Sequence, residues 1–507
     1  MTSSLSAEGV AVLLPDGTPL LESIDLSLPR GVTGLVGPNG SGKSTLLELL
    51  AGLRSPARGR VLRRGRVAFL PQGAAPRGGE SAGALAGAHG AERWRLDRAL
   101  EQVGLAGLDL GRDAATLSGG EATKLRLTGL LLEEPETVLL DEPTNHLDEE
   151  ARRAVRSFVT SFRGAVLVAT HDRELLGHAS RIASLERGRL RVFGGGFAEW
   201  LEARRAESEA ALQAVRAAEQ QLDGARRAGR EAAERQARRS ASGRRAALRT
   251  GVPKMARGAM KRAAQVSAGK LKGVHEERVA AAAAAVAQAR AAAPEEARVF
   301  VDIDASAVPA RKRLVDAGGL NVLLPSGPLW PSPLSFSIVG PERIRLRGPN
   351  GSGKSTLLGL LAGRPPDAGA LVVGAARVAR LDQDAAILGR EGTLAEALRR
   401  LAPACAEHER RLLLGRFGFE QETGEKPVAS LSGGERIRAG LAALLAADRA
   451  PELLLLDEPS NHLDLPGLEA VAAALRAFRG ALVLVTHDAA FARDVEVTRE
   501  LRLPPGT

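Results

Sequence analysis

Two glycine-rich stretches are suited to holding the phosphates of a nucleotide. Residues 37–44 and residues 348–355 both read Gly-Pro-Asn-Gly-Ser-Gly-Lys-Ser and fit the pattern G-x4-G-K-[ST]. In such a loop the glycines let backbone N–H groups approach phosphate oxygens, the lysine reaches the β- and γ-phosphates, and the serine binds Mg²⁺. A single match could be an ordinary glycine-rich turn, but two matches argue against that alternative. The candidate nucleotide-binding residues of the two loops are Gly37, Pro38, Asn39, Gly40, Ser41, Gly42, Lys43, Ser44, Thr45, Gly348, Pro349, Asn350, Gly351, Ser352, Gly353, Lys354, Ser355 and Thr356.

Each half of the chain also carries two neighbouring carboxylates after an apolar run. In the first half Asp141 and Glu142 follow Val138–Leu140, and the second half repeats the arrangement. An aspartate in this position holds Mg²⁺ in phosphate-loop NTPases, and the glutamate beside it can orient or deprotonate the attacking water. The alternative for the glutamate is an ordinary surface carboxylate, which its presence in both copies disfavours. The candidate metal ligands are Ser44, Asp141, Ser355 and Asp457, and the candidate catalytic bases are Glu142 and Glu458.

A strand, a tight loop and a helix must position these residues in each half. The apolar run Val32–Val36 precedes the first glycine-rich loop, and leucines recur at helical spacing within residues 46–50. Ile344–Leu346 precede the second loop in the same way, and Leu453–Leu456 precede the second pair of carboxylates. The pattern therefore predicts strand–loop–helix units that carry the phosphate loops, and short buried strands that end in the acidic pairs.

Four sequence blocks occur twice in the same order. The second copies begin between 311 and 316 residues after the first: GPNGSGKSTLL at residues 37 and 348, LSGGE at 117 and 431, LLDEP at 139 and 455, and Thr-His-Asp ending at 172 and 488. One order at nearly one offset indicates a duplicated domain. We expect domains at residues 1–197 and 298–507, separated by a linker at residues 198–297.

The composition changes between the two repeats. From residue 198 to residue 295 the chain holds 20 basic and 11 acidic residues, so this stretch carries most of the formal net charge of +10. The basic residues concentrate in residues 226–272, and signals that break a helix lie at residues 249–253. We expect two long antiparallel helices that meet at a basic tip, where a helix of about 45 residues would reach roughly 65–70 Å. The alternative is a solvated, partly disordered spacer, because few apolar residues line the two helices.

Composition excludes several classes of protein. An apolar content of 44% and a charged content of 26% are near globular averages, which excludes a collagen-like or mostly disordered chain. The single cysteine, Cys405, excludes an internal disulfide framework and an all-cysteine zinc site. The first residues lack the features of a secretory signal, and no apolar run of about 18 residues occurs. We therefore expect a soluble, cytoplasmic protein.

The matched motifs make the chain resemble an ATP-binding cassette protein with two cassettes, and its details resemble the ABC-F branch. LSGGE is the cassette signature, and the Asn-His-Leu-Asp that follows each acidic pair resembles ABC-F usage. The resemblance implies an α/β fold in which each cassette has a mixed-sheet core and a helical subdomain, joined by a long antiparallel helical hairpin. It also implies ATP and Mg²⁺ as ligands. By position, Gln72 and Gln383 match the glutamine that touches Mg²⁺ and water, and His171 and His487 match the histidine that contacts the γ-phosphate.

The same resemblance implies two composite sites. The loop at residues 37–45, with its acidic pair and histidine, would face the signature of the second cassette. The loop at residues 348–356 would face the signature of the first. Two ATP molecules would then favour the closed arrangement, and hydrolysis would release it. The signature residues concerned are Ser118, Gly119, Gly120, Ser432, Gly433 and Gly434.

One departure from the family concerns the base of the nucleotide. Many cassettes stack an aromatic side chain on adenine, but the chain contains no tyrosine, and the matching positions hold Leu14 and Leu324. A leucine offers apolar contact without ring stacking. We therefore expect weak discrimination between bases.

The resemblance implies a translation-associated ATPase that binds the ribosome and contacts tRNA and rRNA through the linker. The density of arginine and lysine in residues 226–272 suits contact with RNA phosphates, and that segment lacks aromatic residues for base stacking. One alternative is the energising subunit of a transporter with a separate membrane partner; another is a DNA-repair or structural cassette ATPase. We expect no membrane partner, and a monomer whose two cassettes pair within one chain.

Overall fold

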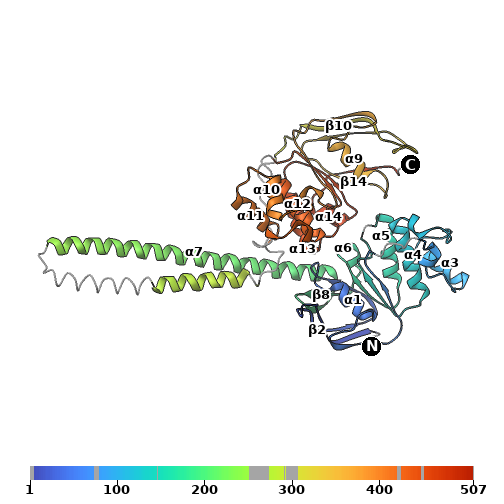
Figure 1. Ribbon diagram of the computed structural model, residues 1–507, viewed down its shortest axis with the longest axis horizontal. Coiled ribbons are helices and arrows are strands. Elements are labelled where there is room, and N and C mark those ends of the chain that lie inside the picture. The colour runs from blue at the N-terminus through green and yellow to red at the C-terminus, as the bar shows by residue number, and fades with distance from the viewer. Residues whose placement is uncertain are drawn as a thin grey trace. The chain divides into compact units, whose positions relative to one another are not determined.

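The computed structural model describes residues 5–73, 79–145, 147–249, 273–290, 292, 307–419, 424–446 and 450–505. The chain divides into two compact units, of which one comprises residues 1–201 and 299–507 and the other residues 202–298. The first unit contains two cassettes, drawn from blue to teal and from yellow to red in Figure 1.

The first cassette is built on two sheets. A six-stranded sheet has the order β5-β6-β7-β3-β8-β9, parallel except for the last pair, and a three-stranded antiparallel sheet has the order β2-β1-β4. The central strands are fully buried apolar runs, as expected for parallel strands covered by helices. The strands are β1 (Leu5–Leu13), β2 (Pro19–Leu28), β3 (Gly31–Val36), β4 (Arg58–Arg63), β5 (Val67–Leu70), β6 (Thr137–Asp141), β7 (Ala165–Ala169), β8 (Arg181–Glu186) and β9 (Arg189–Gly194).

Helices cover these sheets and form a helical subdomain between β5 and β6. Helix α4 begins at the signature, where Ser118 and Glu121 form a capping box: the Ser118 hydroxyl accepts from Glu121 N–H at 3.2 Å, and the Glu121 carboxylate accepts from Ser118 N–H at 2.8 Å. The helices of this cassette are α1 (Lys43–Ala51), α2 (Ala82–Leu85), α3 (Arg93–Gln102), α4 (Gly119–Leu132), α5 (Glu149–Ser161) and α6 (Arg173–Leu176), with a 3-10 turn at Ala114–Thr116.

The second cassette repeats this plan. Its main sheet is five-stranded and parallel, in the order β16-β17-β18-β14-β19, and a three-stranded antiparallel sheet has the order β13-β10-β15. A two-stranded hairpin pairs β11 with β12. The strands are β10 (Arg313–Asn321), β11 (Leu323–Leu324), β12 (Gly327–Pro328), β13 (Leu334–Val339), β14 (Arg343–Arg347), β15 (Ala368–Val373), β16 (Val378–Leu381), β17 (Leu453–Asp457), β18 (Ala481–Val485) and β19 (Arg499–Arg502).

The helices of the second cassette follow the same order as those of the first. Ser432 and Glu435 form hydrogen bonds of 3.2 and 2.8 Å that match the capping box of α4, so both signatures start a helix for the same local reason. The helices are α9 (Lys354–Leu361), α10 (Leu394–Leu401), α11 (Glu407–Arg416), α12 (Gly433–Ala446), α13 (Leu465–Ala477) and α14 (Ala489–Asp494), with 3-10 turns at Ala386–Leu388 and Val428–Ser430.

The structure confirms the predicted strand–loop–helix units. Strands β3 and β14 lead into the two phosphate loops, α1 and α9 follow them, and β6 and β17 end at the acidic pairs. Strands β3 and β6 both pair with β7, and β14 and β17 both pair with β18. One strand therefore separates each phosphate loop from its acidic pair, which brings both to the same end of the sheet.

The second unit is helical in its described residues. Helix α7 (Phe197–Arg249) is 53 residues long and begins in the first cassette, where Phe197 and Trp200 are buried and stack at 5.7 Å. Residues 273–290 form a helix that runs beside α7 (Figure 1). Arg290 donates to Glu219 at 2.5 Å, and a β-carbon at Gly229 would lie 3.9 Å from that of His275, so the two helices are antiparallel.

The predicted basic tip lies partly outside the described residues. Arg235, Arg238 and Arg239 are on α7, whereas residues 250–272, with Lys254, Arg257, Lys261 and Arg262, are not described. Among the described residues, no helix combines the length and apolar character that a membrane span requires.

Candidate active site

The first phosphate loop is shaped by close backbone packing. A β-carbon on Gly37 would lie 2.2 Å from the backbone oxygen of Leu185, and one on Gly42, whose φ is +97°, would lie 3.0 Å from Leu21. These glycines are therefore required by space and by the left-handed backbone. Lys43 is buried, and its Nζ donates to the backbone oxygens of Gly37 at 2.7 Å and of Pro38 at 3.0 Å. Burial lowers the pKa of Lys43, although the charge of Glu142 opposes this shift.

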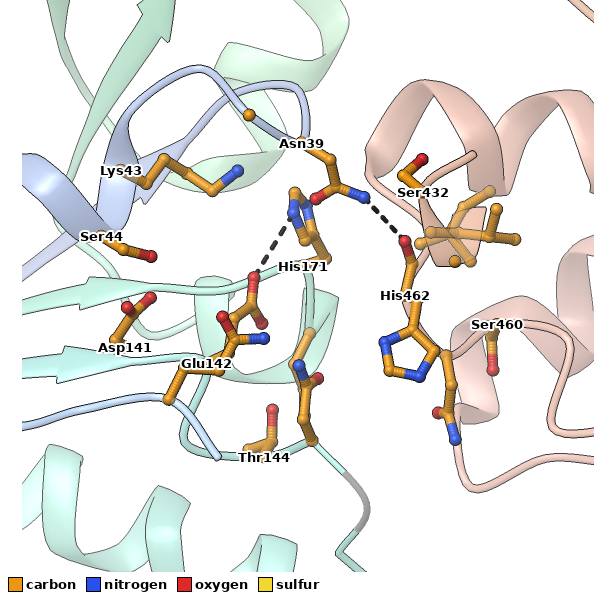
Figure 2. A pocket seen from close by; sticks show the side chains of 18 of the residues that line it. Asn39, Lys43, Ser44, Asp141, Glu142, Thr144, His171, Ser432, Ser460 and His462 are labelled. Carbon is orange, nitrogen blue, oxygen red and sulfur yellow. Dashed lines mark hydrogen bonds and ion pairs between the residues drawn. The ribbon is translucent and has the colours of Figure 1, made fainter. Parts of the chain in front are cut away.

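The first acidic pair ends β6 beside this loop. Asp141 is buried, and burial raises its pKa while a hydrogen bond with Ser44 acts in the opposite direction. Glu142 has a left-handed backbone, with φ of +46°, and its N–H donates to Ala169 O at 2.8 Å. This uncommon conformation turns the chain sharply after β6 and directs the Glu142 side chain into the site (Figure 2).

A histidine lies against the glutamate. His171 Nε2 is 3.4 Å from Glu142 Oε1 (Figure 2). Burial raises the pKa of Glu142 to about 8 and lowers the pKa of His171 to about 3. In the absence of a ligand, Glu142 therefore keeps its proton through much of the neutral range, and His171 is neutral. A carboxyl group with such a pKa can exchange a proton near neutral pH but must be ionised before it acts as a base, and the neutral imidazole can serve as its hydrogen-bonding partner.

Residues of the second cassette complete the wall of this site. The Asn39 side-chain amide donates to His462 O at 2.7 Å, and Asn39 N–H donates to Asp464 Oδ2 at 3.2 Å. Figure 2 shows the phosphate loop on one side of the space and Ser432 and Ser460 on the other. The cavity has a volume of about 600 Å³ and is lined from the first cassette by Leu14, Leu20, Asn39, Gly40, Gly42, Lys43, Ser44, Thr45, Gln72, Asp141, Glu142, Thr144, Asn145, Arg152, His171 and Asp172, and from the second by Ser432, Gly433, Ser460, Asn461, His462, Leu463, Leu468 and Asp488.

The cavity fits ATP and Mg²⁺ on the evidence of its own residues. Its volume is within the range of small-molecule sites. A buried lysine, a loop of close-packed glycines and the start of α1 together suit an anionic phosphate chain. Ser41 Oγ is buried beside them and has no hydrogen-bond partner among the described residues. Asp141 and Ser44 supply the oxygen atoms that Mg²⁺ prefers.

The second cassette builds the same constellation from its own residues. Lys354 Nζ donates to Gly348 O at 2.9 Å and to Pro349 O at 3.0 Å. Glu458 has φ of +49°, and its Oε1 lies 3.3 Å from His487 Nε2. Burial raises the pKa of Glu458 to about 7 and lowers that of His487 to about 3. Asp457 is buried at the end of β17, and Gln383 follows β16.

The two predicted composite sites differ in what the structure brings together. Ser432 and Gly433 line the cavity of the first phosphate loop, and a β-carbon on Gly434 would lie 3.6 Å from the Asn39 amide nitrogen. At the first signature, by contrast, a β-carbon on Gly119 would meet nothing within 4 Å, and one on Gly120 would meet Ala151 and Ser118 of the same cassette. Burial lowers the pKa of Lys354, and the charges of Glu458, Asp457 and, from the first cassette, Asp148 oppose this shift.

Several residues at the cassette interface were absent from the sequence prediction. Arg152 and Leu468 line the cavity but lie outside the repeated motifs, and Asp488, which ends the second Thr-His-Asp block, lines it although it was not proposed as a site residue. A position-by-position comparison of the two repeats beyond the motifs would have drawn attention to them, since Arg152 and Leu468 each stand four residues after the last aspartate of the repeated block.

Comparison with known proteins is consistent with this geometry. A family model described as "ABC transporter" matches residues 21–145 and 332–461, which together make up half of the chain. The tylosin resistance ATP-binding protein TlrC of Streptomyces fradiae is 34% identical, over 96% of this chain and 95% of TlrC. The ribosome protection protein VmlR of Bacillus subtilis is 30% identical, over 93% of this chain and 82% of VmlR.

The chain belongs to the ABC-F family of ATP-binding cassette proteins. As an ABC-F protein it is an ATPase with two cassettes. Among solved structures, the archaeal ribosome recycling factor aABCE1 in complex with the stalk protein aP1 superposes with a TM-score of 0.62 at 21% identity, over 97% of this chain and 87% of that one. This likeness concerns the fold, and it supports the tandem arrangement of the cassettes.

Proposed function

We propose that this ABC-F protein binds two ATP molecules between its cassettes, and that binding and hydrolysis close and reopen the cassettes to act on the ribosome. The observation that carries the proposal is the cavity in which one phosphate loop faces Ser432 and Gly433 of the other cassette. The same observation supports a monomer whose two cassettes pair within one chain. The domains that we propose are residues 1–197 and 298–507 for the cassettes and residues 198–297 for the linker. Action on ribosomes would place the protein in the cytoplasm.

The proposed roles of the residues follow from their placement. Lys43 and Lys354 bind the phosphates, and the N–H groups of the glycine-rich loops hold the phosphate oxygens. Glu142 and Glu458 orient the attacking water and accept its proton. His171 and His487 are neutral donors beside the transferred phosphoryl group. Ser44, Asp141 and Gln72, with Ser355, Asp457 and Gln383, would hold Mg²⁺, which withdraws negative charge from the phosphate oxygens.

The ribosome is proposed as the partner on two grounds. Relatives that the chain matches over more than nine-tenths of its length carry the names ribosome protection protein and energy-dependent translational throttle protein. The chain also has exposed arginines on α7, among them Arg235, Arg238 and Arg239, of a kind that neutralises RNA phosphates. The contact would be made with rRNA and tRNA through residues of about 226–272.

The test uses a variant in which both proposed bases are replaced, Glu142→Gln with Glu458→Gln. The amide keeps the shape of the side chain but cannot accept the proton, so ATP binding should persist while the turnover rate falls by at least about 100-fold. With ATP present, the variant should cosediment with ribosomes more strongly than the wild type does, because it remains in the ATP-bound arrangement.

A matched control separates hydrolysis from binding. Lys43→Ala with Lys354→Ala removes the phosphate-binding charge, so this variant should neither bind ATP nor be retained on ribosomes. Unchanged turnover in the double glutamine variant would contradict the catalytic role of both glutamates. Cosedimentation with membranes or DNA instead of ribosomes would contradict the proposed partner and favour a transporter subunit or a DNA-acting ATPase.

A further inference from the structure

The histidine of each site stands in the middle of a Thr-His-Asp block. His171 Nε2 lies 3.4 Å from Glu142 Oε1, and His487 Nε2 lies 3.3 Å from Glu458 Oε1. Each block directly follows a fully buried strand, β7 in the first cassette and β18 in the second. The position of each histidine therefore depends on what holds the residues on either side of it.

In the first cassette a buried arginine of α5 contacts the residue after the histidine. The Arg152 side chain is 10% exposed, and its Nη1 lies 3.6 Å from Asp172 Oδ2. Its Nε donates to Leu147 O at 3.2 Å. Asp172 Oδ1 in turn accepts from the N–H groups of Glu174 and Leu175 at 3.0 and 3.1 Å, which starts α6. Arg152 thus connects the turn after the acidic pair to the histidine block.

In the second cassette a buried arginine of β14 contacts the residue before the histidine. Arg345 is 5% exposed, and its Nε donates to the backbone oxygen of Thr486 at 3.0 Å. That oxygen belongs to the peptide group that joins Thr486 to His487. Arg345 Nη1 also donates to Glu500 Oε1 at 3.4 Å, so the guanidinium is held from two sides. A hydrogen bond from a charged donor is strong, and here it restrains the peptide group that orients His487.

The residues at the matching positions cannot replace these arginines. Helix α13 carries Leu468 where α5 carries Arg152, and β3 carries Gly34 where β14 carries Arg345. A leucine side chain has no hydrogen-bond donor, and a glycine has no side chain. Each cassette therefore has one of the two contacts and lacks the other.

The neighbours of the β3 and β14 positions differ in a matching way. Gly34 pairs with Ile182 of β8 at the register where Arg345 pairs with Glu500 of β19. A β-carbon on Gly34 would lie 2.7 Å from Leu176 Cδ2 and 3.0 Å from Ile182 Cδ1, so apolar side chains fill the space there. An ion pair in the second cassette thus replaces an apolar contact in the first, and both sheets are fully packed at this point.

We propose that each cassette uses a different buried arginine of its own to position the histidine of its site. Arg152 acts through the aspartate of the first block, and Arg345 acts through the threonine carbonyl oxygen of the second. Both are positioning residues, since they act through the block and not on the nucleotide. This inference rests on the proposed roles of the two histidines. It follows that a single substitution can impair one site and spare the other.

The experiment measures each site while the other is blocked. Glu142→Gln leaves the second site able to hydrolyse, and Glu458→Gln leaves the first. Phosphate formed in the first turnover at saturating ATP is measured by rapid quench, which does not require the blocked site to reopen. Arg152→Leu should slow the first site by about tenfold and the second by less than about twofold. Arg345→Met, which keeps a long side chain without a donor, should show the reverse pattern.

Matched controls come from the same helix and the same strand. Arg156 of α5 forms an ion pair with Glu174, and Arg347 of β14 donates to Glu500 at 3.1 Å. Arg156→Leu and Arg347→Met should slow either site by less than about twofold, because these partners lie outside the two histidine blocks.

Conservative variants separate positioning from packing. Arg152→Lys and Arg345→Lys keep a charged donor and should restore most of the lost rate. Arg152→Gln and Arg345→Gln are shorter and neutral but remain polar, and they should show the same crossed pattern as the apolar variants. Denaturant unfolding identifies any apolar variant that fails to fold, in which case its glutamine counterpart provides the test.

A histidine-free background tests the route of action. With His171→Ala and Glu458→Gln present, Arg152→Leu should slow the remaining turnover by less than about twofold, because the group that it positions is absent. Arg345→Met should behave likewise with His487→Ala and Glu142→Gln.

Equal slowing of both sites by either arginine variant would overturn the inference, because the arginine would then support the fold in general. An unchanged rate at the matching site would overturn it as well, and so would a full additional effect in the histidine-free background. If Glu142→Gln and Glu458→Gln together leave turnover unchanged, the catalytic roles proposed above fail, which is a separate outcome.

Discussion

At the scale of single residues, burial sets the chemistry of both catalytic glutamates. Each stands directly after a buried strand, in a left-handed conformation, with a histidine 3.3 to 3.4 Å away. Few residues adopt that conformation without a compensating reason, because the β-carbon meets the following peptide group. The sharp turn directs the carboxyl group into the site and removes it from water, and the loss of water raises the pKa.

One prediction concerns the stability of the ligand-free protein as the pH changes. Burial raises the pKa of Glu142 to about 8 from an ordinary value of 4.5, so between these pH values the folded protein binds the proton more tightly than the unfolded chain does. Folding free energy is therefore lost as the pH rises through this window. Glu142→Gln removes the effect, and its stability relative to wild type should grow by at least about 1 kcal/mol between pH 5 and pH 8.

Urea unfolding at several pH values, with EDTA and without nucleotide, measures this difference. The buried His171, whose pKa is lowered to about 3, acts in the opposite sense below pH 6.5, but it is present in both proteins and cancels in the comparison. A difference that stays constant from pH 5 to pH 8 would contradict the raised pKa of Glu142.

A second prediction at this scale concerns the base of the nucleotide. Leu14 and Leu20 line the first cavity, where they can give apolar contact to a base without ring stacking. We expect ATP and GTP to compete with affinities within about tenfold of each other, and Leu14→Trp to strengthen binding of both by roughly 0.5–1.5 kcal/mol. Competition against a fluorescent ATP analogue measures both effects. A preference for ATP of 100-fold or more in the unaltered protein would contradict the expectation.

At the scale of elements, a buried tryptophan supports the second phosphate loop through a hydrogen bond that the leucine in the corresponding place at the first loop cannot make. The Trp330 indole is fully buried and donates to Ser352 O at 2.9 Å. Asn321 holds the Trp330 backbone on both sides, donating to its oxygen at 2.8 Å and accepting from its N–H at 3.1 Å. At the first loop, Leu21 occupies the corresponding position beside Gly42, and its side chain has no hydrogen-bond donor.

Removing this hydrogen bond should therefore weaken the second loop. Trp330→Phe leaves the Ser352 carbonyl oxygen buried without its donor and should lower the free energy of unfolding by about 1–3 kcal/mol, with weaker ATP binding at the second site. The matched control is Trp94→Phe, because Trp94 is 62% exposed and should tolerate the change within about 0.5 kcal/mol. Denaturant unfolding and ATP titration compare the two variants, and equal effects would contradict the bracing role.

At the scale of the whole molecule, charge is divided between the helical unit and the cassettes. Residues 226–272 hold 15 basic residues and only 2 acidic ones, while the formal net charge of the entire chain is +10. On α7 the side chain of Arg235 is 69% exposed; its Nη2 lies 3.6 Å from the Glu231 carboxylate and its Nε donates to Glu231 O at 3.3 Å, and such exposed contacts are worth little in water. Such arginines are available to an anionic partner.

Neutralising Arg235, Arg238 and Arg239 to glutamine should weaken ribosome binding without changing the ATPase rate measured in the absence of ribosomes. Binding should also depend less steeply on salt. Each replaced arginine that binds a phosphate should reduce the slope of the logarithm of the binding constant against the logarithm of the salt concentration by up to about one unit. Three exposed arginines of the first cassette, Arg58, Arg64 and Arg98, provide a control of equal charge. An unchanged salt slope in the α7 variant would show that these arginines do not bind phosphate.

The fold and much of the site could be predicted from the sequence because their determinants are local. A glycine-rich loop between a strand and a helix, a buried strand that ends in two carboxylates, and a serine three residues before a glutamate each specify geometry within a few residues. Duplication of these motifs was sufficient to predict two cassettes. The strong helix-forming composition predicted the helices of the linker.

Tertiary structure alone decided which residues of one cassette meet the other. Asn39 bonds to His462 and Asp464 more than 400 residues away, and Arg173 forms an ion pair with Asp494, because packed surfaces and not sequence spacing bring these groups together. The motifs of the two repeats are nearly identical, so from sequence the two sites are equivalent. The difference between them arises where the surfaces meet, since a charge in a buried boundary acts strongly on whatever group faces it, and only the folded chain determines that group.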